Sequence, residues 1–293
     1  MNNYLIFRTD RIGDFLISSI LIKSIKLNDK RAHISVVCSS KNYSYIKDFN
    51  FIDEVFLLEN SFINKLKIIL SLKKRSYKNI IVHDDKGRSK FISFFLKGKK
   101  KIYIKDKEKF THIEIIKNIL NESGLIFNNE SLNYLDERKV TYDNKEKFIL
   151  FHFDEKWIFD DYIKNFKNIE PSEGELISFL NSMISKTQKK IIITTGTKTP
   201  NIIKKVKSSL DSNKIKFLDN QNFNDLEQVV SKCEILISCH GAISHVAAAK
   251  RIKQIDIIDK SYDYNRWTSH FRNYNYLYRE KFSNLSKEIL QKL

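Results

Sequence analysis

The stretch RTDRIGD, residues 8–14, stands between two apolar segments of different length. The run Tyr4–Phe7 predicts a strand, and Phe15–Leu27 predicts a helix. A carboxylate beside a glycine at such a junction lies where open α/β sheets bind ligands. Gly13 permits a close approach of backbone or substrate. Asp14 either takes part in chemistry or only caps the helix, whose dipole favours an ionised carboxylate at this end.

The same alternation of strand and helix patterns recurs along the chain. Strands are expected near residues 4–7, 33–38, 54–58, 79–83 and 101–104, and again near 148–153, 190–194, 214–218, 235–238 and 254–258. Helical patterns lie between them, including one at 159–166 and a closing helix at 282–293. Such alternation predicts parallel sheets with helices on both faces.

The polar stretch 136–147 interrupts this alternation. We therefore expect an α/β protein of two doubly wound, Rossmann-like domains that face a cleft. The first domain is expected to span residues 1–140 and the second residues 147–293. The C-terminal helix is expected to pack back. Ligands of such sheets bind at the carboxyl ends of the strands.

The composition indicates a basic, soluble protein. Hydrophobic residues make up 42% of the 293 residues, and no run is long and apolar enough to span a membrane. The net charge of +17 (52 − 35) favours an anionic partner, although a Lys-, Asn- and Ile-rich bias is the alternative explanation. The absence of a signal peptide and the three unpaired cysteines predict a cytoplasmic protein with free thiols.

Three polar segments follow predicted strands in the second half. The first, Asp154-Glu155-Lys156-Trp157, offers an ammonium group that can reach a phosphate, or is an ordinary charged loop. The second contains Thr195 and Gly196 and is typical of a phosphate- or ribose-contacting turn, but also of any tight turn.

The third segment runs from Ser238 to Ala249 and is the strongest of the three. Gly241 and Ala242 open a helix whose N-terminus favours a diphosphate, and His240 and His245 can donate to the same group. A zinc site built on Cys239 and the two histidines matches no standard spacing, and a reactive Cys239 is a minor alternative.

Together these segments resemble the heptosyltransferase family, glycosyltransferase family 9, which has the two-domain GT-B fold. Arg11-Ile12-Gly13-Asp14 matches the Gly-Asp motif of that family. Asp154-Glu155-Lys156-Trp157 resembles its Lys-Trp element, and residues 241–249 resemble its Gly-x-x-x-His-x-Ala-Ala signature. The three motifs occur in the family's order over most of the chain.

The resemblance implies an inverting transfer of a sugar, typically from ADP-heptose, to a lipopolysaccharide or related surface-glycan acceptor. It makes Asp14 the general base, and it places Lys156, Gly241 and His245 at the donor. With the local patterns, the expected donor-binding residues are Lys156, Thr195, Gly196, His240, Gly241, Ala242 and His245. The acceptor side is expected to have Arg8, Arg11 and Gly13. No metal and no cofactor beyond the nucleotide sugar are expected.

The chain departs from the family pattern at two places. Cys239-His240 stands where the family has Asp-Ser/Thr, and Ile158 replaces the proline after the Lys-Trp element. These departures leave the donor open. The expected partners are the nucleotide sugar and an anionic glycolipid acceptor at the inner membrane surface, to which the protein would be peripheral. The alternative is a non-catalytic nucleotide-sugar or polyanion-binding protein. Nucleic-acid binding has only the charge to support it.

Overall fold

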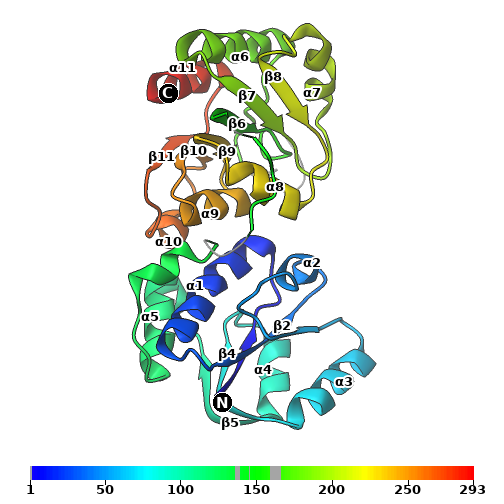
Figure 1. The fold of residues 1–293 in the computed structure, drawn as a ribbon, viewed down its shortest axis with the longest axis vertical. Helices are drawn as coiled ribbons and strands as arrows, with labels where there is room; N and C mark the ends of the chain where they lie inside the picture. The colour runs from blue at the N-terminus through cyan, green and yellow to red at the C-terminus, as the bar shows by residue number, and fades with distance from the viewer. Residues whose placement is uncertain (1, 136–138, 145, 159–165) are drawn as a thin grey trace. The chain divides into compact units, whose positions relative to one another are not determined.

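The computed structural model describes residues 2–135, 139–144, 146–158 and 166–293, which form two compact units (Figure 1). The first unit comprises Met1–Arg138 and Asn265–His270, and the second comprises Lys139–Tyr264 and Phe271–Leu293. Among the described helices, none combines the length and the apolar character that a membrane crossing needs. Each unit is a doubly wound α/β domain, as the alternating sequence pattern predicts.

The first unit has, in its described residues, a five-stranded sheet with all strands parallel. The order is β3-β2-β1-β4-β5. The chain order therefore reverses between β1 and β4, which is the switch point where such sheets bind ligands. The strands are β1 (Asn3–Phe7), β2 (His33–Cys38), β3 (Glu54–Leu57), β4 (Ser76–Val82) and β5 (Lys97–Tyr103).

The helices that connect these parallel strands cover both faces of the sheet. The helices are α1 (Ile12–Asn28), α2 (Tyr43–Ile46), α3 (Phe62–Lys73), α4 (Gly87–Phe94) and α5 (His112–Glu122), with short 3-10 turns η1 (Lys107–Lys109) and η2 (Asn129–Asn133). α1 contacts α5, whereas α3 and α4 bury their inner residues in one cluster with the sheet. α5 begins where Thr111 and Glu114 form a reciprocal capping box.

The second unit has a six-stranded parallel sheet within the described residues, in the order β11-β10-β9-β6-β7-β8. Its switch point lies between β6 and β9. The strands are β6 (Phe148–His152), β7 (Lys190–Thr194), β8 (Ile215–Leu218), β9 (Ile235–Cys239), β10 (Lys253–Ile258) and β11 (Tyr274–Tyr278). The helices are α6 (Glu173–Thr187), α7 (Asn201–Val206) with η4 (Lys207–Ser209), α8 (Phe223–Val230), α9 (Ala242–Ala249) and α11 (Phe282–Lys292).

Several elements differ from the sequence prediction. The helix expected at 159–166 lies outside the described residues. β5 begins at Lys97 rather than near residue 101, because an edge strand tolerates exposed lysines. β11 was not predicted, since its alternating tyrosines leave only Leu277 buried.

The C-terminal part of the chain is divided between the two units. α11 packs against α6 and β11 of its own unit. The short helix α10 (Asn265–Thr268) belongs instead to the first unit, where Trp267 packs on His112 and Arg266 pairs with Glu108.

Candidate functional site

The switch point of the first sheet gathers polar side chains from the ends of β1 and β4. Phe7 and Val82 are register partners, so Arg8 and His83 follow side by side. Arg8 is buried, and its Nε donates to the carbonyl of Asp14 at 2.9 Å and to Ser18 Oγ at 2.8 Å. Its Nη1 donates to the carbonyl of His83 at 2.8 Å. This arginine therefore fixes the loop between β1 and α1 and is not a free surface cation.

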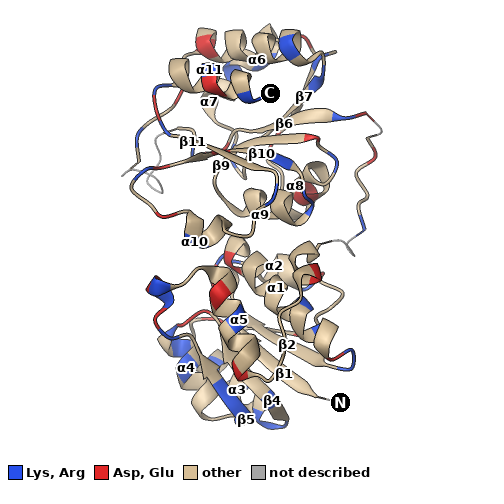
Figure 2. Ribbon diagram, turned by 90° about the vertical axis from the view of Figure 1, so that its left-hand side faces the viewer, with Lys and Arg blue, Asp and Glu red and all other residues tan. Residues whose placement is uncertain are grey.

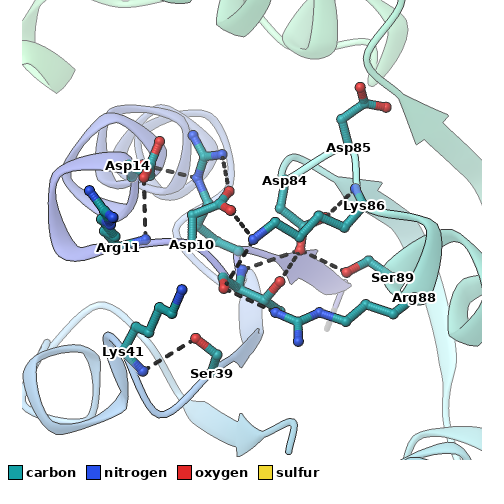
Figure 3. A network of polar contacts seen from close by, with 12 residues as sticks. Asp10, Arg11, Asp14, Ser39, Lys41, Asp84, Asp85, Lys86, Arg88 and Ser89 are labelled. Carbon is teal, nitrogen blue, oxygen red and sulfur yellow. Dashed lines mark hydrogen bonds and ion pairs between the residues drawn. The ribbon is translucent and has the colours of Figure 1, made fainter. Parts of the chain in front are cut away.

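Asp84 and Asp10 connect the two loops further (Figure 3). The buried Asp84 carboxylate accepts hydrogen bonds from Thr9 Oγ1 at 2.6 Å and from Ser89 Oγ at 2.7 Å. Asp10 forms ion pairs with Arg8 and Lys86. Asp84 and Lys86 were not predicted, although a polar run directly after the buried strand β4 was a usable signal.

Asp14 lies in the first turn of α1, at the edge of this network (Figure 3). Its carboxylate accepts the backbone N–H of Arg11 at 3.2 Å, and its side chain is only half-buried. The residue thus caps the helix and keeps a carboxylate oxygen near solvent. Arg11 is exposed, and Gly13 lies in the same helical turn.

Two histidines of the first unit have ring nitrogens without a hydrogen-bond partner among the described residues. His83 Nδ1 bonds Ser18 Oγ at 2.8 Å, whereas its Nε2 is buried without a partner. Both ring nitrogens of His112 are buried and unpartnered among the described residues. The centre of its ring lies 4.0 Å from the centre of the Trp267 ring. Burial, with the Arg8 charge adding to it, lowers the pKa of His83 and brings that of His112 to about 3. Both imidazoles are therefore neutral at pH 7.

In the second unit the carboxyl end of β6 carries an ion pair between a buried carboxylate and a partly buried lysine. Lys156 Nζ lies 2.5 Å from Asp154 Oδ2, and His152 Nε2 lies 3.4 Å from the same oxygen. Burial opposes the charge of Asp154, but Lys156 and His152 outweigh it and lower the pKa of this carboxyl. Burial likewise opposes the charge of Lys156, but Asp154 raises its pKa above the ordinary value. The ammonium group is therefore charged and held in place.

Glycines bring the neighbouring loops close to this pair. A Cβ atom on Gly241 would lie 2.8 Å from Lys156 Nζ and 3.4 Å from its Cε. The lysine ammonium therefore lies against the first turn of α9. A Cβ on Gly196 would meet a Glu155 carboxylate oxygen at 3.2 Å. The loops after β6, β7 and β9 therefore converge at one place.

His240 is oriented by a carboxylate whose role was not predicted. Its Nδ1 lies 2.6 Å from Asp256 Oδ2, and Asp256 is fully buried in β10. Asp256 also accepts hydrogen bonds from Ser244 Oγ at 2.9 Å and from Tyr274 at 3.2 Å. An acidic residue inside the apolar run KQIDII was the signal for this role.

Aromatic rings surround the two histidines of this segment. The ring centres of His240 and His245 are 5.6 Å apart, and His245 is buried. Tyr264 lies 4.9 Å from His240, and Phe271 lies 5.2 Å from His245. His245 is therefore enclosed by rings within the start of α9, whereas His240 keeps a partly exposed edge.

Arg279, which directly follows β11, binds the Lys156 backbone. Its guanidinium donates to the Lys156 carbonyl at 2.7 Å and to the Lys167 carbonyl at 2.9 Å. It also approaches Cys239 Sγ at 3.6 Å. Burial raises the pKa of the Cys239 thiol, which is the opposite of what a reactive thiolate needs.

The structure brings together most of the expected donor-side residues. Gly241 lies against Lys156, Gly196 lies against Asp154 and Glu155 of the same loop, and Ala242 is the first residue of α9. Thr195 is buried, and its hydroxyl accepts the Asn220 backbone N–H at 3.0 Å, which ties it to the next loop. Among the described residues no group of three or more His, Cys, Asp or Glu is arranged to hold a metal ion.

The two units define a class of protein: two doubly wound α/β domains with parallel sheets, as in the GT-B fold. No protein-family model matches the sequence, and no curated protein matches it. Solved structures do match it over nearly the whole chain.

Among these matches are heptosyltransferases. Heptosyltransferase WaaC of E. coli with ADP-2-deoxy-2-fluoro heptose superposes with a TM-score of 0.73 at 12% identity, over 99% of this chain and 100% of that one. E. coli ADP-heptose lps heptosyltransferase II gives 0.70 at 13% identity, over 100% and 97%. A glycosyl transferase family 9 protein from Veillonella parvula gives 0.69 at 11%, over 99% and 91%. The resemblance in the sequence motifs is thus matched by the fold.

A second group shares the fold less closely. UDP-GlcNAc 2-epimerase from Methanocaldococcus jannaschii has a TM-score of 0.60 at 13% identity, over 100% of this chain and 92% of that one.

Proposed function

We propose that this protein is a glycosyltransferase that moves a sugar from a nucleoside-diphosphate donor to the hydroxyl group of a glycan acceptor. The reaction class is an inverting displacement without a metal ion. A heptose-like sugar carried by ADP is the favoured donor. A lipopolysaccharide or related surface glycan is the favoured acceptor. The protein works in the cytoplasm.

The observation that carries the proposal is the position of Lys156. Its ammonium group lies against Gly241 at the N-terminus of α9, at the switch point of the second sheet. A fixed cation and exposed backbone N–H groups together favour a diphosphate. His240, oriented by Asp256, is the further donor that this site offers. These groups supply positive charge to the departing nucleotide where a metal ion would otherwise be needed.

The acceptor side is assigned to the first unit. Asp14 accepts the proton of the attacking hydroxyl, because its carboxylate is only half-buried and accepts the Arg11 N–H. Arg8 supports Asp14 through the backbone carbonyl of that residue. Arg11, which is exposed, and Gly13 lie in the same turn, where an anionic acceptor group is expected.

The base is tested by Asp14→Asn, which keeps a side-chain oxygen for the Arg11 N–H but removes the basic group. We expect transfer to fall about 10²–10⁴-fold while donor affinity and unfolding midpoint stay unchanged. Asp29→Asn, at the other end of α1, is the matched control and should keep full activity. Full activity of Asp14→Asn would show that this carboxylate only caps the helix.

The donor is tested by calorimetry with ADP-, UDP-, GDP- and CMP-linked sugars. The preferred donor should raise the melting temperature of the native protein, because it binds only the folded state. In the Lys156→Met variant the same donor should not raise the melting temperature.

A non-catalytic nucleotide-sugar or polyanion-binding protein is the second candidate. The Cys239-His240 pair favours it, because the expected carboxylate and hydroxyl are missing there. Donor binding that depends on Lys156, with no transfer across a broad acceptor panel, would support this candidate over the enzyme.

A further inference from the structure

α3 has a second apolar face that does not contact the core. Ile68, Ile69 and Leu72 point inward and join the buried cluster of the first unit. The outer side carries four large apolar residues that are exposed to solvent: Phe62 (69%), Ile63 (66%), Leu66 (44%) and Leu70 (64%). Positions 62, 66 and 70 are four residues apart and form one stripe along the helix. A helix that is apolar on two sides normally has a partner on each.

α4 continues this exposed apolar stripe. Phe91, Phe94 and Phe95 are 55%, 75% and 39% exposed. Their rings contact one another, with centres 5.1 Å apart for Phe91 and Phe95 and 5.5 Å apart for Phe94 and Phe95. Lys73, at the end of α3, lies 5.7 Å from the Phe95 ring, and the two helices run side by side in both views (Figures 1 and 2). We call the seven residues the α3–α4 surface: Phe62, Ile63, Leu66, Leu70, Phe91, Phe94 and Phe95.

The two segments that carry the α3–α4 surface contain only positive charges, of which Arg75 pairs with Glu54 and Lys90 with Asp85. Residues 62–75 contain five Lys or Arg and residues 87–101 contain six, and neither segment contains Asp or Glu. Figure 2 shows this basic colouring on α4 and β5. Lys101 lies 5.8 Å from the Phe94 ring, so the cations border the exposed rings directly.

We propose that the α3–α4 surface docks the protein on an anionic phospholipid bilayer. Exposed aromatic and aliphatic residues insert into the boundary between headgroups and acyl chains, and the surrounding lysines bind the acidic headgroups. A second copy of the chain fits less well, because a symmetric contact would place two sets of positive charges together. A nucleic acid would match the charge but not the aliphatic stripe of α3.

This inference goes beyond the proposed transfer reaction and does not depend on it. Membrane docking is measured without donor or acceptor, and donor binding is measured without vesicles. Failure of either proposal therefore leaves the other untouched.

The test is flotation of the full chain with vesicles. We expect binding to vesicles of phosphatidylcholine with phosphatidylglycerol, little binding to phosphatidylcholine alone, and weaker binding at high salt. The triple variant Phe62→Ser, Leu70→Ser, Phe94→Ser should reduce the partition coefficient at least tenfold. The triple variant Lys67→Glu, Lys73→Glu, Lys97→Glu should do the same.

Matched controls come from exposed residues elsewhere. Ile126→Ser removes an apolar side chain that is 77% exposed outside the α3–α4 surface, and Lys287→Glu reverses an exposed charge on α11. Both should bind vesicles like the unchanged protein. Since every replaced side chain is exposed, unfolding midpoints should be preserved, and circular dichroism checks this.

Three results would overturn the proposal. The first is vesicle binding that survives the serine variant. The second is a dimer in sedimentation that the serine variant dissociates, with no vesicle binding by the unchanged protein. The third is binding to an oligonucleotide that requires the same apolar residues while vesicles are ignored.

Discussion

Mild acid should destabilise the first unit, because it contains histidines that are kept neutral. Burial, with the Arg8 charge adding to it, lowers the pKa of His83 well below the ordinary value and that of His112 to about 3. Burial also lowers the pKa of His270 to about 4. In the unfolded chain the same imidazoles have pKa values of about 6.5. Below pH 6.5 these imidazoles therefore bind protons in the unfolded chain but stay neutral in the folded chain.

The size of the effect follows from this difference in proton binding. Each histidine costs about 1.36 kcal/mol of stability for each pH unit below about 6.5, until the pH reaches its folded pKa. At pH 5 the loss is about 2 kcal/mol each for His112 and His270, and His83 adds to it in the same direction. The total stability of a domain is about 5–15 kcal/mol. About one pH unit above 6.5 the loss has almost vanished, because the unfolded chain is then neutral too.

The variant His112→Phe isolates one of these contributions. A phenyl ring keeps the packing on Trp267 and removes two buried ring nitrogens that have no partner among the described residues. We expect the variant to be at least as stable as the unchanged protein at pH 7.5. From pH 7.5 to pH 5 its advantage should grow by about 2 kcal/mol.

Tryptophan fluorescence in urea measures the unfolding of this unit selectively. Trp267 lies in the first unit and Trp157 in the second, so Trp157→Phe as a common background leaves one reporter. Unfolding midpoints are compared at pH 7.5, 6.5, 5.5 and 5. If His112→Phe shows the same pH dependence as its background, the neutral state of this imidazole is refuted.

Further predictions concern the second unit and the thiols. Gly241→Ala should fold normally, since its extended backbone (φ −178°) suits any residue, but the new Cβ displaces the Lys156 ammonium, and donor affinity in calorimetry should fall about tenfold. Asp256→Asn replaces a carboxylate that accepts several hydrogen bonds, so urea unfolding should show a loss of about 1–3 kcal/mol. Native protein should react slowly with a thiol reagent and denatured protein should react fully, because burial raises the pKa of all three thiols: Cys38 to about 12, and Cys233 and Cys239 as well.

The fold could be predicted from the sequence because its elements are separated by clear changes in pattern. The buried strands β1, β4, β6 and β9 are nearly continuous apolar runs, and polar turns follow them. The exceptions are elements with a weak apolar signal. β5 is a lysine-rich edge strand, and β11 is a tyrosine-rich strand with one buried residue.

The candidate site could be predicted only in part. Lys156 and Gly241 could be singled out because each follows a buried strand, where parallel sheets bind ligands. Asp256 and Arg279 were not, since their roles depend on partners far along the chain: His240 for Asp256 and the Lys156 carbonyl for Arg279. A charge inside an apolar run signals a buried role but does not identify the partner.

The sequence by itself determined the alternating architecture, the basic charge and the polar turns at Asp14, Lys156 and Gly241, because these depend on local periodicity and residue type. Only the tertiary structure decided which of those turns meet. The reversal of strand order places the ends of β6 and β9 together, and the missing side chain of Gly241 then lets the Lys156 ammonium lie at the start of α9. It also left the apolar stripe of α3 exposed, since the sheet covers only one side of that helix.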